Sequence, residues 1–157
     1  MPTTILRIAL VVLLLLPSAA ALAAPPAASS SSPTVLVHKT PTCGCCGRWV
    51  ERLQRDGFTV IVQDSDDLSP IKRRLAIPPG MASCHTAEVA GYFIEGHVPV
   101  SDIRRLLRER PALKGLLLPG MPAGSPGMEM PDGRVDTYTV QAMGEDGTIT
   151  EFSTHAP

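Results

Sequence analysis

Residues 34–57 read TVLVHKTPTCGCCGRWVERLQRDG, and this stretch decides the fold. Its first five residues form a short apolar, β-branched run that is typical of a buried strand. After Pro41 a helical pattern starts at Cys43, with apolar residues recurring on one face at positions i, i+3, i+4 and i+7. The residues on that face are Cys46, Trp49, Val50 and Leu53. The stretch therefore predicts a strand, a cysteine-bearing loop and an amphipathic helix that ends at Asp56-Gly57.

Further strands and helices are predicted downstream from apolar runs, caps and turn residues. The expected strands are 58–62, 89–94 and a partner at 97–98, and the expected helices are 69–75 and 102–108. A loop rich in Met, Pro and Gly covers 119–134, and two runs around Asp146-Gly147 form a C-terminal hairpin signal. This order predicts an α/β fold, with a mixed thioredoxin-like sheet flanked by helices and a C-terminal β-hairpin.

The N-terminus has the layout of a secretory signal peptide. An apolar run from Ile8 to Leu16 follows a single positive charge, and Ala21 and Ala23 have the spacing of an A-x-A cleavage site. A transmembrane anchor is the alternative, but the run is short for a bilayer span and Pro17 interrupts it. We expect a signal peptide (1–24), a disordered Pro-, Ala- and Ser-rich linker (25–33) and one folded domain (34–157).

Charge and hydropathy exclude several partners. The formal net charge is −1 at pH 7, and loss of the leader with Arg7 makes it −2. No basic stripe with interleaved aromatic residues occurs, so we expect no nucleic-acid partner. No second long apolar run follows the leader, so we expect no membrane association after cleavage.

Four cysteines carry the chemistry: Cys43, Cys45, Cys46 and Cys84. An exported chain with four cysteines is ordinarily interpreted as having two disulfides. Here three cysteines lie within four residues, and the neighbours Cys45 and Cys46 can hardly bridge each other, so the spacing favours a metal or redox site. A helix N-terminus stabilises thiolates, and by analogy with the predicted fold Cys84 should lie beside it.

The ligand spacing favours Cu(I) over zinc by a small margin. Zinc sites usually use two separated C-x-x-C pairs, whereas three crowded thiolates suit bridging in a site with more than one Cu(I) ion. Soft thioethers in the 119–134 loop strengthen the case for copper over zinc. The possible further ligands are His85, Met121, Met128 and Met130. The methionines are equally well interpreted as gap fillers. The other histidines, His38, His97 and His155, are interpreted as ordinary strand-end or surface residues.

Several motifs outside the cysteines complete a pattern. They are KTPTCGCC (39–46), SCHT (83–86), GY (91–92), EGHVP (95–99), LPGMP (118–122) and GSPGM (124–128). Over residues 34–153 the combination resembles the CopG-like copper-resistance family. The resemblance implies a periplasmic protein of thioredoxin-like fold that binds copper and takes part in copper tolerance. It also implies a ligand role for the four cysteines, and for His85 and the methionines only proximity to the site.

Three functions follow as hypotheses. The first is a periplasmic protein that holds Cu(I) in copper homeostasis, with copper ions and other periplasmic copper-handling proteins as its partners. The second is a thiol- or copper-based oxidoreductase, in which Cys43 and Cys46 exchange disulfides or the site moves electrons. The third is a structural four-cysteine zinc domain, which would unfold when its metal is removed.

Overall fold

The computed structural model of the protein describes residues 33–157. The predicted signal peptide and all of the predicted linker except Pro33 lie outside the described residues. Within the described part, no helix is both long and apolar enough to cross a membrane.

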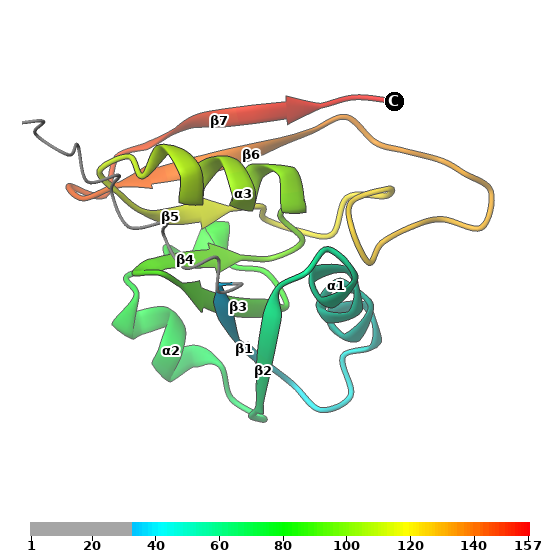
Figure 1. The fold of residues 1–157 in the computed structure, drawn as a ribbon, viewed down its shortest axis with the longest axis horizontal. Coiled ribbons are helices and arrows are strands. Elements are labelled where there is room, and N and C mark those ends of the chain that lie inside the picture. The colour runs from blue at the N-terminus through cyan, green and yellow to red at the C-terminus, as the bar shows by residue number, and fades with distance from the viewer. Residues whose placement is uncertain (1–32) are drawn as a thin grey trace, which may run out of the picture. The chain divides into compact units, whose positions relative to one another are not determined.

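One mixed sheet of seven strands organises the described residues, in the order β2-β1-β3-β4-β5-β6-β7 (Figure 1). Pairing is parallel between β1 and β2 and between β4 and β5, and antiparallel elsewhere. The strands are β1 (Thr34–Lys39), β2 (Thr59–Asp64), β3 (His85–Val89), β4 (Tyr92–Glu95), β5 (Leu113–Leu117), β6 (Tyr138–Gly144) and β7 (Ile149–His155). The helices are α1 (Gly44–Arg55), α2 (Ser69–Arg74), α3 (Val100–Glu109) and the 3₁₀ turn η1 (Pro79–Met81).

The two faces of the sheet carry different residues, because side chains alternate along a strand. On one face Val35, Val37 and Ala87 pack with the apolar sides of α1 and α3 in the larger core cluster. On the other face Thr86 and Glu88 contact Lys72 and Arg74 of α2. Helices α1 and α2 therefore cover opposite faces of the sheet (Figure 1).

The mixed α/β class is confirmed, and so are the predicted order of elements from β1 to α2 and the helix predicted at 102–108, which is α3. Helix α1 buries Cys46, Trp49, Val50 and Leu53, the face that the periodicity predicts. The C-terminal hairpin is β6 and β7, joined through Gly147, whose φ is 86°. The thioredoxin-like assignment stays a prediction.

The single strand predicted for 89–94 is wrong, because the chain turns there. Ala90 and Gly91 have φ values of 49° and 91°, and this two-residue turn separates β3 from β4. Positive φ at both central positions is typical of a tight hairpin, and Ala is an uncommon residue at the first of them. The partner strand predicted at 97–98 is also wrong: these residues lead from β4 into α3, while β5, which was not predicted, pairs with β4.

A buried ion pair fixes the segment that enters β3. The Glu95 side chain is fully buried and pairs with Lys72 of α2. Its carboxylate also accepts hydrogen bonds from the hydroxyl of Thr86 (2.7 Å) and from the backbone N–H of Ser83 (2.6 Å). Glu95 therefore holds both residues that flank Cys84 and His85 in the chain.

We expect Lys72→Met to lower the free energy of unfolding by about 3 kcal/mol, because it leaves the Glu95 carboxylate buried without its cation. Denaturant unfolding followed by circular dichroism measures the change. Arg108→Met is the control: that exposed side chain pairs with exposed Glu109, and its loss should cost less than about 1 kcal/mol. Equal effects of the two substitutions would contradict the role given to the Lys72–Glu95 pair.

Candidate metal site

Three of the four cysteines lie at the N-terminus of α1. Cys43 is the N-cap residue, and Cys45 and Cys46 occupy the first turn. Cys46 is fully buried with the core face of the helix, while Cys43 and Cys45 are half-buried at the opening, as predicted. The free N–H groups of a first turn carry partial positive charge, which stabilises thiolates or other negative groups placed there.

Cys84 joins them because of strand pairing. It directly precedes β3, and the antiparallel register places His85 opposite Lys39 at the end of β1, just before the cysteine loop. The Sγ atom of Cys46 lies 3.8 Å from the carbonyl oxygen of Cys84. The sulfur atoms of all four cysteines lie within 4.8 Å of one another. The structure thus brings together every cysteine that the sequence singles out, and their role as ligands stays a prediction.

Two of these cysteines are bonded to each other. Cys43 and Cys46 form a disulfide, whereas Cys45 and Cys84 are free thiols. The Sγ atom of Cys45 lies 3.5 Å from that of Cys43. A site with four thiolates therefore requires this disulfide to be reduced first.

His97 lies at the site, which corrects its interpretation as a surface residue. It is fully buried, and its Nε2 atom lies 3.2 Å from the Sγ atom of Cys84. Gly96 turns the chain inward with a φ of 78°, where a Cβ atom would lie 2.4 Å from the carbonyl oxygen of Leu118. The available signal was the EGHVP motif, in which a glycine precedes the histidine.

His85 also lies at the site, as its proximity to Cys84 in the sequence suggested. Its Nδ1 atom is 3.5 Å from the Sγ atom of Cys84. The centroid of its ring lies 4.4 Å from that of Trp49 and 4.9 Å from that of His97. Burial is the main cause that lowers the pKa of His85 well below its usual value, and burial also lowers the pKa of His97. Both imidazoles are therefore neutral near pH 7, the form that binds metals.

The Met-, Pro- and Gly-rich loop packs against the start of α1 and lies beside that helix in Figure 1. Arg48 Nε donates to the carbonyl oxygen of Gly127 at 3.0 Å. The contact is close at Gly127, where a Cβ atom would lie 2.7 Å from the carbonyl oxygen of Cys45 and 2.9 Å from the backbone nitrogen of Trp49. Ser83 Oγ anchors the beginning of the loop by donating to the carbonyl oxygen of Gly120 at 2.8 Å.

The three loop methionines differ in position. Met121 reaches the cluster, with its Sδ atom 4.0 Å from the Sγ atom of Cys45, and its side chain is half exposed. The backbones of Met128 and Met130 form hydrogen bonds that shape the loop, with Ser125, Gly124 and Gly133 as their partners. The geometry therefore favours Met121 as the additional soft ligand.

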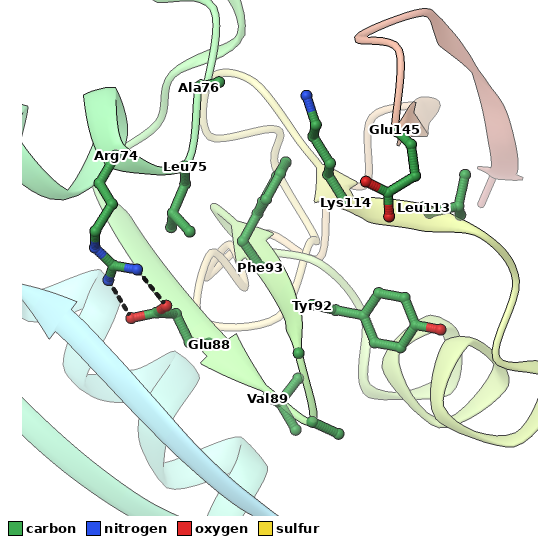
Figure 2. Close-up of a pocket in the computed structure, with 12 residues that line it drawn as sticks. Arg74, Leu75, Ala76, Glu88, Val89, Tyr92, Phe93, Leu113, Lys114 and Glu145 are labelled. Carbon is green, nitrogen blue, oxygen red and sulfur yellow. Dashed lines mark hydrogen bonds and ion pairs between the residues drawn. The ribbon is translucent and has the colours of Figure 1, made fainter.

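The remaining histidines lie elsewhere. His38 contacts Glu88 at 3.2 Å on the α2 side of the sheet, and His155 contacts Asp102 at 2.7 Å beside α3. A cavity of about 460 Å³ opens at the β3–β4 turn (Figure 2). Its charged residues include Arg74 and Glu88, which pair with each other, and no cysteine, methionine or histidine lines it. Among the described residues, both clusters of cysteine and histidine ligand atoms lie at the cysteine end of the sheet.

Comparison with known proteins gives a consistent result. Residues 81–128 match a family described as "Protein of unknown function, DUF411". Two solved structures, titled "Copper resistance protein copG- Form 2" and "Copper resistance protein copG- Form 1", share 42% sequence identity with this chain. Their TM-scores against this chain are 0.76 and 0.75. The matches span 80% and 81% of this chain and the whole length of each solved chain. No curated protein matches the chain.

The two free thiols should react differently with an alkylating agent. Burial, followed by the negative charge of Cys45, raises the pKa of Cys84 to about 11, so little of its reactive thiolate exists at neutral pH. With the disulfide intact and no metal, iodoacetamide should modify Cys45 first, and the rate at Cys84 should keep rising as the pH approaches 11.

Mass spectrometry of the peptides measures the two rates. In guanidinium chloride, where the environments are lost, both thiols should react alike. Equal rates at pH 7 in the folded protein would contradict the environment described for Cys84.

Proposed function

The chain belongs to the CopG copper-resistance family, and we propose that it is a periplasmic protein that holds Cu(I) on Cys43, Cys45, Cys46 and Cys84. One observation carries the proposal: four cysteine sulfur atoms from two distant segments converge within 4.8 Å of one another at the N-terminus of α1. Thiolate sulfur is a soft ligand that selects Cu(I), and the helix terminus offsets part of the repulsion between thiolates.

The same spacing supports a site with more than one Cu(I) ion. Three of the four sulfur ligands come from residues 43–46, and only Cys84 comes from elsewhere. A single tetrahedral zinc ion is usually held by two separated pairs, whereas crowded thiolates can share copper ions between them. Met121 adds a thioether beside Cys45 at the exposed side of the cluster, where an ion could enter or leave.

Loading of this site depends on the state of the disulfide. Each sulfur of the Cys43–Cys46 bond becomes a thiol when a dithiol reductant supplies two electrons and two protons and is itself oxidised to a disulfide. The fully reduced chain offers four sulfur ligands, and the oxidised chain keeps only Cys45 and Cys84 as thiols. Reduction is therefore a precondition for the four-thiolate site.

Thiol–disulfide exchange is the second candidate function, and the Cys43–Cys46 disulfide at a helix N-terminus is the observation that favours it. Against simple exchange, the Cys45 sulfur lies 3.5 Å from that of Cys43 and offers a competing bond. The two functions differ in what they require: an exchange enzyme turns over a dithiol substrate without metal, whereas a copper-binding protein does not.

The proposed location has its own test. The signal-peptide layout of residues 1–24 supports export to the periplasm. When a Gram-negative bacterium expresses the full chain, we expect the periplasmic fraction to contain a protein that begins at Ala24 or Pro25. Deletion of residues 2–24 should leave the protein in the cytoplasm. Recovery of the uncleaved chain from the cytoplasm would contradict export.

Ligand counting tests the copper site. We expect the anaerobically reduced protein to bind more than one Cu(I) per chain in competition with a chelator, and Cys84→Ser to bind fewer ions while its circular dichroism is unchanged. Loss of one bridging sulfur removes a ligand from the site but leaves no cavity in the hydrophobic core, because Cys84 is only partly buried.

Two control variants sharpen this count. His155→Gln lies away from the cluster and should keep the wild-type stoichiometry. Met121→Leu should keep the stoichiometry but release copper to the chelator faster, because only the thioether at the exposed side is lost. An unchanged ion count in Cys84→Ser would overturn the four-thiolate site.

A further inference from the structure

Cys84 takes part in a second cluster that involves no other cysteine. One ligand atom each from Cys84, His85 and His97 lies within 4.8 Å of the other two. The Sγ atom of Cys84 is 3.2 Å from Nε2 of His97 and 3.5 Å from Nδ1 of His85. These residues come from the start of β3 and the turn after β4, so the cluster draws no ligand from α1.

The Pro126 carbonyl fixes the orientation of the His97 imidazole. Nδ1 of His97 lies 2.8 Å from the carbonyl oxygen of Pro126. A carbonyl can only accept a hydrogen bond, so Nδ1 carries the proton and Nε2 of the neutral ring presents its lone pair to Cys84. Metal-binding histidines commonly have this arrangement, in which one ring nitrogen donates to a carbonyl and the other binds the ion.

Aromatic packing holds His85 in place. Its side chain is fully buried between the rings of Trp49 and His97, and its Nε2 atom has no hydrogen-bond partner among residues 33–157. The polar contact that its other nitrogen, Nδ1, makes with a side chain is with the Sγ atom of Cys84. Nδ1, and not the unpaired Nε2, is therefore the nitrogen that His85 offers to the cluster.

The cluster is independent of the disulfide. In the structure, where Cys43 and Cys46 form that bond, Cys84 is a free thiol and both imidazoles lie beside it. We propose that Cys84, His85 and His97 form a mixed sulfur–nitrogen site that binds one copper ion while the Cys43–Cys46 disulfide is intact. The inference rests on the proposed copper function, which it extends from the reduced to the oxidised chain.

The ligand chemistry fits copper. One thiolate with two neutral imidazoles is a donor set that copper and zinc both accept, and copper binds such sites more tightly than the other divalent first-row metals. In this arrangement Cys84 is a ligand in both states of the chain. The oxidised protein would therefore retain a metal ion on the β3–β4 side after two of its four thiolates had been removed.

Co(II) is the probe for the experiment, because a thiolate-to-cobalt absorption band reports sulfur coordination and Co(II) does not reduce a disulfide. The oxidised protein, with two free thiols per chain confirmed by counting, is titrated anaerobically with Co(II). We expect one Co(II) per chain with the thiolate band. Cys84→Ser should abolish the band, and His97→Gln should weaken binding by about tenfold or more.

Two matched variants separate this site from the four-cysteine cluster. Cys45→Ser should keep the band, because Cys45 is no ligand of the mixed site, and His38→Gln should keep it because His38 lies on the α2 side of the sheet. Absence of the band in the wild-type protein, its loss in Cys45→Ser, or its survival in His97→Gln at full affinity would overturn the proposal. Circular dichroism checks that each variant is folded.

The Cu(I) count on the reduced protein is measured in parallel, so that the two proposals can fail separately. A multinuclear Cu(I) count in the reduced protein without a Co(II) band in the oxidised protein overturns only the mixed site. A Co(II) band in the oxidised protein with no multinuclear Cu(I) binding in the reduced protein overturns only the four-thiolate site.

Discussion

Backbone hydrogen bonds between β1 and β3 hold His85 opposite Lys39, at the end of β1 that leads into the cysteine loop. Because side chains alternate along a strand, a slip of one residue would move His85 to the opposite face of the sheet. The contact between His85 and Trp49 would then be lost. The buried Glu95 carboxylate restrains this register by accepting hydrogen bonds from Ser83 and Thr86, on either side of Cys84 and His85.

Two chemical states compete for the same sulfur atoms. In the proposed copper site Cys43 and Cys46 serve as two ligands, which they cannot do while they form a disulfide, whereas Cys84 is a free thiol. Four thiolates held within 4.8 Å repel one another strongly unless a cation or the helix N-terminus offsets their charge. Without metal, disulfide formation relieves that repulsion. If the four cysteines hold copper as proposed, copper binding and oxidation of the chain are coupled through this one pair of residues.

The sequence predicted the parts of the site that have local signals. The 3.6-residue period placed Cys46 on the buried face of α1, and the crowded spacing of residues 43–46 indicated a soft-ligand or redox site. It did not predict the turn at Ala90, because an alanine with positive φ leaves no mark in an apolar run. It also misplaced His97, since the direction of that side chain depends on packing of Gly96 against Leu118, a contact between distant segments. Nor could spacing alone specify which cysteines pair.

The central claim is that the four cysteines form a copper site. The most direct test is to reduce the protein without oxygen, offer Cu(I) and Zn(II) in competition, and count ions and free thiols per chain. The account predicts more than one Cu(I) per chain, all four thiols protected from alkylation, and zinc displaced. Retention of one zinc ion against copper, or no bound metal with a Cys43–Cys46 disulfide that forms again, would contradict it.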